Sequence, residues 1–535
     1  MISEKNLLTV NQRISLANGF TQAITAANVY LTIGQESPYT ANDLLIPVPN
    51  QSTDYINNIW RNMVALKRVT AADVAFVVPR VDWQSGVVYD MWDNQVDMYS
   101  TIDLAALQGT VNVSNSRTVI GTNTTFLSQL TNGNLLYLGG DGENTAPQIL
   151  QVTDILSNTS LNVNTSFSGS FIQNTPYLVT DTSPNYATNF YARNSMDQVF
   201  ICLQNNNGVT STVMPQLSIG GQLPINPFII TSDGYKWKYL YTIPSGQKQL
   251  FFSKDWMPVF RDPSVVAATV DGEIDIIVIN NGGSGYNQNV ASNSASIITI
   301  VGDGVNANAT AKVDANGSIF DINLLNGGSG YTTANVVLNA GVNGAGANLR
   351  VIIGPQGGHG YNPVYELGAT SVMVSLKLSG TEGGTLPTGA SVGTGLFEYR
   401  QIGLILQPLL VSGSFATNTN YGTITTVTVQ PLPAGQFFNI AETVYQGSSL
   451  AQATFVGTVV FWDDTNDILW LNNINGSFSP QSPIIGTIQT TPVTAFILTP
   501  SVVKKYSGRI LYVNNVLPVI RGANQTEQVR LILSF

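Results

Sequence analysis

Acid–base and nucleophilic chemistry has few residues to use in this chain, which contains one histidine, His359, and one cysteine, Cys202. A catalytic histidine needs a nucleophile and an orienting acid within reach. The stretch GPQGGHGYNP is typical of a turn, so we expect the His359 imidazole to bond to nearby backbone. Cys202 lies in the apolar run VFICLQ and is expected to be a small core residue. These counts exclude a multi-histidine metal site, a cysteine zinc cluster and an internal disulfide.

Carboxylates are the only abundant candidates for catalysis. Glycoside hydrolysis needs two carboxyl groups roughly 5–9.5 Å apart. Asp463 and Asp464 are adjacent in FWDDTND, so in a strand they would face opposite ways. We interpret that segment as a polar hairpin turn between VVFW and ILWL. Asp82, in VDW, and Asp233, in SDGY, are expected to be hydrogen-bond acceptors in turns.

Glycine-rich segments could be mistaken for phosphate or calcium sites. The motif GGSGY, at 282–286 and 327–331, lacks the Lys and the following helix of a P-loop and is better explained by turn chemistry. GGDGEN (139–144) and VGDGVN (301–306) lack the ordered ligands of an EF-hand, which leaves calcium as a minor alternative.

Aromatic residues alternate in SDGYKWKYLYTIP (232–244), with Tyr235, Trp237, Tyr239 and Tyr241 expected on one face. Such a row could stack on sugars or bases, but without basic surroundings we expect it to pack in the core or in a subunit interface. The sequence therefore predicts no catalytic residue, no cofactor, no metal ion and no small-molecule substrate.

The composition points away from enzymes and nucleic-acid binders. Only 10% of the 535 residues are charged, against about 25% in ordinary globular domains. Lys+Arg is 22 and Asp+Glu is 32, which does not give the basic surface of a nucleic-acid-binding protein. The start, MISEKNLLTV, shows no signal peptide, and no run of 18 apolar residues occurs. We expect a protein made in the cytoplasm, without membrane insertion.

The elements near the N-terminus are mixed. Residues 11–26 predict a modest helix, and 28–34 alternate like a strand. Residues 52–69 predict a better helix, capped by Ser52 or Thr53, with one apolar face made of Tyr55, Ile56, Ile59, Trp60, Met63 and Leu66. Strands are expected at 75–80 and 196–204.

The chain divides into a mixed α+β core and three inserted β modules. The core pieces are 1–103, 185–265, 362–413 and 501–535, the last with strands RILYV and QVRLILSF. The modules are 104–184, 266–361 and 414–500, where turn residues break short apolar runs. The predicted fold class is mainly β, a layered β-sandwich core with two or three short helices plus small all-β modules.

The second module contains a repeat. GGSGY recurs with Tyr286 and Tyr331 separated by 45 residues, and GGHGY (357–361) is a degenerate third copy. The glycines permit left-handed turns, and each tyrosine can plug its turn back onto the sheet. In the third module we expect a core of Val444, Phe455, Val459, Phe461, Leu469, Leu471 and Phe478.

Five stretches, in family order, resemble the baseplate wedge subunit of T-even-type contractile-tail phages, the gene product eight family. They are YLTIGQESPYT (30–40), VVPRVDW (77–83), SDGYKWKYLYTIP (232–244), FEYRQIGLILQPL (397–409) and SGRILYVNNVLPVIRGANQTEQVRLILSF (507–535). The terminal stretch is the most specific, because a strand, N-N-x-x-P-x-x-x, Q-T-E and an aliphatic run to Phe535 follow one another. The resemblance covers roughly half of the chain. The three modules are absent from short family members, which suggests a larger, cyanophage-like relative.

The resemblance implies a structural protein of the virion, in the tail baseplate, assembled in the host cytoplasm. Such subunits are homodimers of layered β structure that lie among the products of genes six, seven and ten. Six wedges ring a central hub and change shape when the tail contracts. The family supplies no catalytic residues, and low charge suits permanent interfaces.

Two alternatives belong to other classes. A tail-fibre or spike protein that binds or degrades host polysaccharide also fits β modules and sparse charge, although spikes usually carry long repetitive shafts. A secreted bacterial adhesin is disfavoured because no export signal is visible.

Overall fold

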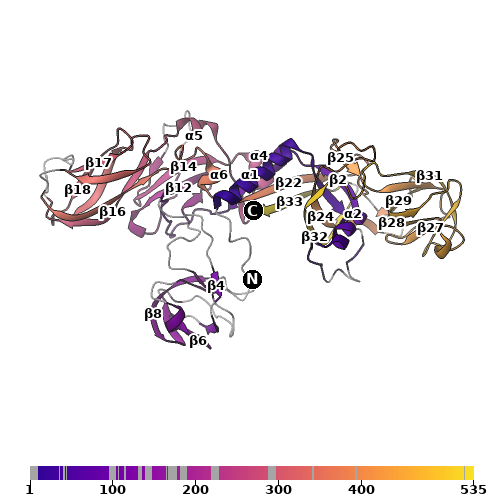
Figure 1. The fold of residues 1–535 in the computed structure, drawn as a ribbon, viewed down its shortest axis with the longest axis horizontal. Helices are drawn as coiled ribbons and strands as arrows, with labels where there is room; N and C mark the ends of the chain where they lie inside the picture. Colours follow the sequence, from indigo (N-terminus) through magenta and orange to yellow (C-terminus); the bar gives the residue numbers. More distant parts are fainter. Residues whose placement is uncertain are drawn as a thin grey trace.

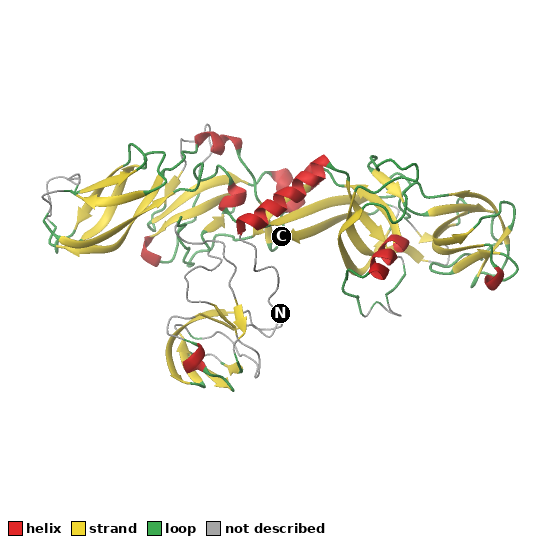
Figure 2. Ribbon diagram, viewed as in Figure 1, coloured by secondary structure: helices red, strands yellow, loops and turns green. Residues whose placement is uncertain are grey.

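A computed structural model shows a mainly β chain with 46% strand and 13% helix, which confirms the predicted fold class (Figures 1 and 2). The glycine-rich module lies at one end of a long body, and a closed barrel lies at the other (Figure 1). The module formed by residues 104–184 lies beside the body. No helix among the described residues is long and apolar enough to cross a membrane. The structure describes residues 10–34, 37–39, 43, 45–94, 104–106, 108–113, 116–130, 135–138, 148–163, 166, 178–180, 189–217, 228–286, 297–339, 343–388, 390–391, 395–522 and 524–535.

Two antiparallel sheets form the centre of the body. The first has the order β23-β24-β1-β2-β25, with β32 paired to the other edge of β24. Its strands are β1 (Val29–Gly34), β2 (Met63–Arg68), β23 (Ala390–Ser391), β24 (Gly395–Leu406), β25 (Asn420–Gly422) and β32 (Arg509–Arg521). The second has the order β15-β3-β22-β33, with strands β3 (Val74–Pro79), β15 (Trp256–Pro258), β22 (Ser371–Ser379) and β33 (Thr526–Ser534).

The C-terminal strands connect these two sheets. β32 pairs with β24 in the first sheet, and β33 pairs with β22 over nine positions in the second, from Ser371↔Ser534 to Ser379↔Thr526. Leu31 and Leu404 of the first sheet share one hydrophobic cluster with Val374 and Leu531 of the second. The two sheets therefore form a layered core whose strands come from four distant parts of the chain.

Helix α1 (Val10–Ala26) confirms the predicted N-terminal helix, and α2 (Thr53–Asn62) begins where expected. The Ser52 hydroxyl caps α2 by accepting a hydrogen bond from the Tyr55 N–H at 3.2 Å. The predicted helix over 52–69 is nevertheless too long, because Met63–Arg68 is strand β2. Pairing with β1 and β25 satisfies the backbone of β2 on both sides. Its apolar side chains are buried there as well as a helix would bury them, so tertiary pairing overrides the helical pattern.

A four-stranded sheet, β11-β12-β14-β13, lies next to the second central sheet. Its strands are β11 (Tyr191–Arg193), β12 (Gln198–Asn205), β13 (Phe228–Ile230) and β14 (Tyr235–Thr242). Tyr235, Trp237 and Tyr239 pack in one cluster, but Tyr241 packs in another, together with Leu240. The expectation of four aromatic side chains on one face is therefore wrong for Tyr241. The physical reason is a register shift at Leu240, since Val199 pairs with Tyr241 and Phe200 with Tyr239.

A seven-stranded sheet is built entirely from residues within 104–184, in the order β4-β10-β7-β8-β9-β6-β5. Val119, Phe126, Leu136, Leu150 and Leu161 are among the buried residues of its core. The elements are β4 (Leu104–Ala106), β5 (Thr110–Asn112), β6 (Thr118–Thr122), α3 (Phe126–Gln129), β7 (Leu135–Leu138), β8 (Gln148–Ser157), β9 (Ser160–Val163) and β10 (Leu178–Thr180).

The glycine-rich module consists of three antiparallel strand pairs, β16–β21, β17–β20 and β18–β19. Ile274, Ile298, Ala309, Tyr331 and Val351 share one cluster, so the three pairs pack around a common core. The strands are β16 (Ile274–Ser284), β17 (Ile298–Gly302), β18 (Asn308–Val313), β19 (Ile319–Asn326), β20 (Ala334–Leu338) and β21 (Ala345–Ile353).

The two GGSGY copies have the same local geometry. Tyr286 and Tyr331 are buried, and their hydroxyls accept hydrogen bonds from the N–H groups of Ala347 (3.2 Å) and Ala307 (3.4 Å). Gly283 and Gly328 have φ of 64° and 66°. This confirms that the tyrosines plug the turns. In the third copy, Tyr361 is instead 42% exposed.

Residues 425–499 form a closed barrel with the order β26-β29-β28-β27-β30-β31. The barrel core includes Val444, Phe455, Val459, Leu469 and Leu471 as predicted, with Phe478 packed against it. Phe461 instead joins the central core with Val460, because a register shift after Val459 turns Trp462 into the barrel. The strands are β26 (Thr425–Val429), β27 (Thr443–Gln446), β28 (Phe455–Asp463), β29 (Ile468–Gly476), β30 (Pro483–Gly486) and β31 (Val493–Thr499).

The second GGSGY turn gives a matched pair of variants. At Gly328 an added Cβ would lie 2.3 Å from the Val305 carbonyl oxygen, whereas at Gly330, with φ of 74°, nothing lies within 4 Å. Both alanine variants incur left-handed strain of about 1–2 kcal/mol, but only Gly328→Ala adds a backbone clash. We expect Gly328→Ala to speed amide hydrogen exchange across β17 and β20 much more than Gly330→Ala, measured by mass spectrometry on the whole chain. Equal effects would contradict the plugged-turn geometry.

Candidate functional site

The single histidine lies in a buried ionic cluster. His359 Nε2 is 2.7 Å from a carboxylate oxygen of Asp275, and Nδ1 is hydrogen-bonded to the carboxylate of Glu366. All three side chains are buried. Asp275 lies on β16, and Glu366 ends the short helix α6 (Pro363–Glu366). The expectation that the imidazole bonds to nearby backbone is therefore wrong, because the fold brings in a carboxylate from 84 residues away.

The cluster keeps the imidazole charged. Burial alone would lower the pKa of His359, but the carboxylates of Asp275 and Glu366 outweigh it and raise the pKa to about 9. The second oxygen of Glu366 accepts the Gly360 N–H at 2.7 Å. The edge of the Trp92 ring packs on the imidazole, with 4.7 Å between the ring centroids. Since each ring nitrogen is held by a carboxylate, His359 is a charged tie between β16 and α6.

Two lysines on β14 complete the junction between the four-stranded sheet and the glycine-rich module. Lys236 Nζ donates to the Asp275 carbonyl at 2.7 Å, and Lys238 Nζ lies 3.9 Å from the Glu273 carboxylate. Burial lowers the pKa of both lysines. Arg350 of β21 forms an ion pair with Asp93 in the same region. Charged groups from distant parts of the chain therefore hold this junction together.

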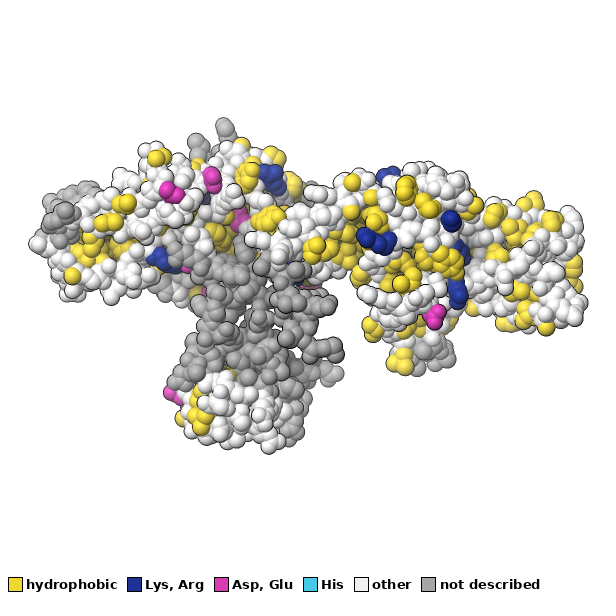
Figure 3. Space-filling view, in the orientation of Figure 1, with side chains coloured by type: hydrophobic (Ala, Val, Ile, Leu, Met, Phe, Trp, Pro, Cys, Tyr) yellow, Lys and Arg dark blue, Asp and Glu magenta, His cyan; other side chains and the backbone are white. Residues whose placement is uncertain are grey.

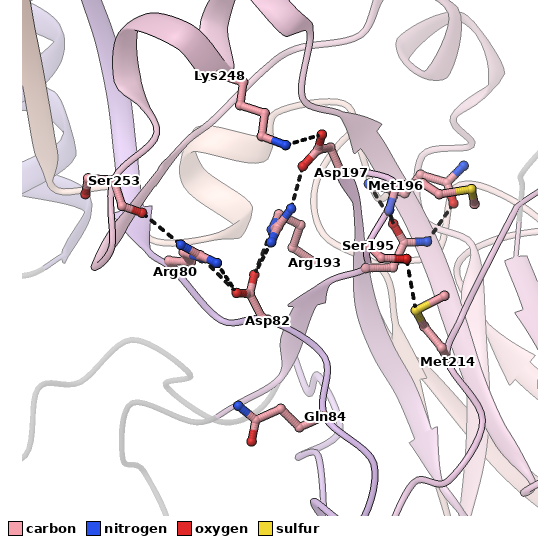
Figure 4. A network of polar contacts seen from close by, with 12 residues as sticks. Arg80, Asp82, Gln84, Arg193, Ser195, Met196, Asp197, Met214, Lys248 and Ser253 are labelled. Carbon is pink, nitrogen blue, oxygen red and sulfur yellow. Dashed lines mark hydrogen bonds and ion pairs between the residues drawn. The ribbon is translucent and has the colours of Figure 1, made fainter.

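A second ionic network surrounds Asp82 (Figure 4). Its carboxylate accepts hydrogen bonds from Arg80 Nε at 2.8 Å and Arg193 Nε at 2.7 Å. Arg193 also pairs with Asp197, whose other oxygen is 2.8 Å from Lys248 Nζ on α4 (Ser245–Phe251). Burial raises the pKa of Asp82, but the two arginines outweigh it and lower the pKa overall. Asp82 is therefore an ion-pair centre that joins the segment after β3 to β11, and Asp197 extends the network to α4, which corrects the predicted role of Asp82 as a turn acceptor.

The aromatic ring of Phe252 lies under the same cations. Arg80, Arg193 and Lys248 place their charged groups 4.5, 4.8 and 5.5 Å from the ring centroid. The side chains of Arg80 and Lys248 are 26% and 42% exposed. Solvent screening at this surface leaves each pair with little net stabilisation, so the network mainly fixes geometry.

The other predicted turn acceptors are confirmed. Asp233 accepts the N–H groups of Thr212 (2.7 Å) and Val213 (2.9 Å); burial raises its pKa, but its hydrogen bonds, led by that from Thr231, lower it to about 2. Asp463 accepts the Asn466 N–H at 3.1 Å in the β28–β29 turn, and Asp464 is exposed in that turn.

Cys202 and the glycine-rich loops have structural roles. Cys202 is a buried core residue as predicted, and burial raises the pKa of its thiol. Asp303, in VGDGVN, accepts hydrogen bonds from the Thr332 hydroxyl and from the N–H groups of Thr333 (3.0 Å) and Thr332 (2.9 Å), which lower its pKa, the hydroxyl most. GGDGEN (139–144) lies outside the described residues. In the described ranges, no group of three or more His, Cys, Asp or Glu residues could hold a metal ion.

An apolar groove of about 650 Å³ lies between α1 and the C-terminal strands, and no pattern in the sequence indicated it. Within the described residues, β32 and β33 each pair on one side only, so two strand edges border this region. Figure 3 shows many hydrophobic side chains over the central sheets. The groove is lined by Gly19, Phe20, Ala23, Leu406, Arg509, Leu511, Tyr512, Ile532, Leu533, Ser534 and Phe535. Apolar side chains beside strand edges are suited to binding another protein.

Sequence reasoning missed these sites for different reasons. Arg80 and Asp82 are two residues apart on an extended segment, so their shared face could have indicated an ion pair. The partners of His359 and the walls of the groove come from segments that the sequence does not relate. Comparison with known proteins adds no relative: no protein-family model matches the chain, and no curated protein matches its sequence.

The His359 cluster predicts a specific pH dependence. Because the pKa rises from 6.5 to about 9 in the folded chain, its stabilisation is full below pH 6.5 and is lost as the pH rises through 9. The shift corresponds to on the order of 3 kcal/mol. We expect the calorimetric melting temperature of the glycine-rich module to fall between pH 7 and 10. In His359→Gln the melting temperature should be lower and should depend less on pH.

The lysines need a control, because Lys236 and Lys238 have lowered pKa values and act in the opposite direction as the pH rises. Both lysines are retained in His359→Gln, so the difference between the two profiles isolates the histidine. The exposed Asp464→Asn variant should keep the parent profile. An unchanged profile in His359→Gln would contradict the buried charged tie.

Proposed function

We propose that this chain is a structural subunit of the baseplate wedge of a contractile phage tail. In this role it is a homodimer that holds neighbouring wedge proteins, resembling the products of genes six, seven and ten, during assembly and rearrangement on infection. It works as part of the virion by transmitting force, without a catalytic step.

The observation that carries the proposal is the place of the two C-terminal strands, β32 and β33. Residues 507–535, the stretch that most resembles the wedge family, join the two central sheets and form one wall of the apolar groove. A subunit that transmits force needs its core to be continuous with its binding surface. β32 and β33 supply both, because each is paired on one edge and borders the groove region on the other.

The physical character of the surface supports the same role. Permanent interfaces bury apolar area and are depleted in charge. Of the described residues that line the groove, Arg509 is the single cation among mainly apolar side chains, and none is Asp or Glu. The ionic ties of Asp82 and His359 connect segments distant in sequence, which suits a subunit that transmits force.

Labelling of virions that contain this chain tests the proposal directly. We expect gold-labelled antibody against the barrel, residues 425–499, to bind at the baseplate and not along fibres. Label at fibre tips would overturn the proposal in favour of a receptor-binding protein. Intact particles without label would exclude a structural role.

Two helical glycines allow a matched test of the groove. Gly19 of α1 lines the groove and Gly246 of α4 does not, and nothing lies within 4 Å of an added Cβ at either position. Replacing either glycine by Gln favours the helix by roughly 0.5–1 kcal/mol, so both variants should fold. We expect Gly19→Gln to be absent from purified tails, measured by mass spectrometry, and Gly246→Gln to be incorporated normally. Equal incorporation would show that the groove is not an assembly surface.

A further inference from the structure

A second cavity, of about 730 Å³, lies between the start of α1, the loop after β21 and α6. Figure 1 shows α6 beside the N-terminal end of α1. The cavity lining combines polar side chains with two tyrosines, and the cavity volume lies within the range of small-molecule sites. The residues are Asn11, Thr269, Asp271, Pro355, Gln356, Gly357, Gly358, Tyr361, Asn362, Tyr365 and Glu366.

The third copy of the glycine repeat forms this cavity, and its tyrosine has a different position from the other two. Tyr286 and Tyr331 are 3% and 5% exposed and plug their turns, whereas Tyr361 is 42% exposed and lines the cavity. Gly358 and Gly360 have positive φ values of 84° and 87°, as the equivalent glycines of the other copies do, but Gly357 also has a positive φ of 84°, unlike Gly282 and Gly327. The turn therefore differs at its first glycine, and its tyrosine is not buried. In this copy the aromatic ring is presented to solvent.

The buried histidine cluster fixes the second tyrosine. On α6, Glu366 points inward to His359, while the neighbouring Tyr365 is 37% exposed and lines the cavity. Arg261 holds the other ring, because its guanidinium lies 5.2 Å from the Tyr361 centroid and its Nε donates to the Tyr361 carbonyl at 3.0 Å. The two rings are therefore positioned by rigid neighbours, which reduces the entropy cost of binding.

The polar lining is rich in hydroxyl-binding groups and lacks cations. Asp271 accepts the Gly357 N–H at 2.6 Å and has further lone pairs to offer. Gln356, Asn362 and Asn11 provide amides that both donate and accept. Among the described residues no Lys or Arg lines the cavity, and the Asp271 carboxylate disfavours phosphate, sulfate and nucleic acid.

We propose that this cavity binds a neutral oligosaccharide, with the Tyr361 and Tyr365 rings against the apolar faces of the sugar and Asp271 and the amides on its hydroxyls. The site shares no lining residue with the groove beside the C-terminal strands β32 and β33. Such a site would let a structural subunit contact a glycan surface. Its test is separate from that of the baseplate proposal, so either proposal can fail without the other.

Calorimetric titration of the full chain tests this site. The probes are the neutral tetrasaccharides of glucose, galactose, mannose and N-acetylglucosamine, with oligothymidylate and a sulfated oligosaccharide as charged comparisons. We expect saturable binding of at least one neutral probe and none of the charged ones. Failure of all four neutral probes would overturn the proposal, and binding of oligothymidylate alone would indicate a nucleic-acid site.

Three tyrosine variants assign the binding to the cavity. Tyr365→Ala should weaken affinity about tenfold or more through loss of aromatic contact, while Tyr365→Phe should retain most of it. Tyr506→Ala removes a tyrosine of similar exposure, 55%, at a distant position and should bind as the parent does. Unchanged affinity in Tyr365→Ala, with melting temperatures equal in all variants, would also overturn the proposal.

Discussion

Backbone pairing of the last two strands holds the body together. β33 completes the second central sheet along β22, and β32 completes the first along β24. Removing either would leave a row of buried strand donors and acceptors without partners, which costs more than the loss of a few side-chain contacts. Strand β33 also places Leu531 in the core shared by both sheets. The most distinctive stretch of the sequence is thus the one on which continuity of the core depends.

The chain uses its few charges where modules meet. Ordinary domains distribute many charged pairs over their surface, but here buried or half-buried pairs connect separate segments. His359 joins β16 to α6, Arg193 joins β11 to Asp82 and Asp197, and Arg350 joins β21 to Asp93. A buried charge without its partner is strongly unfavourable, so such ties specify one arrangement even where their net stabilisation is small. The low charge content and the connected architecture are therefore compatible.

The glycine-rich module shows how one motif serves two purposes. In two copies the tyrosine closes a turn in which one glycine, Gly283 or Gly328, has left-handed backbone and no room for a side chain. In the third copy the glycines persist, but the tyrosine is turned outward, beside a cavity supported by the histidine cluster. The third glycine turn and the histidine cluster therefore position the tyrosines for which we propose a binding role.

Local pattern was sufficient for much of this protein. Alternating apolar runs between Gly and Asn turns determined the β-rich fold, and the spacing of GGSGY determined the two plugged turns. Ser52 was sufficient to place the start of α2. These features depend on a few neighbouring residues, so the sequence alone contains their cause.

Only the tertiary structure decided the features that depend on strand pairing and distant partners. Met63–Arg68 became a strand because β1 and β25 were available on both sides, and single-residue register shifts moved Tyr241 and Phe461 to other clusters. Asp275 as a partner of His359, Arg193 as a partner of Asp82, and the two sides of the apolar groove also come from segments far apart in the chain. Long-range contacts leave no periodic signal in the sequence, so their geometry is determined only when the sheets assemble.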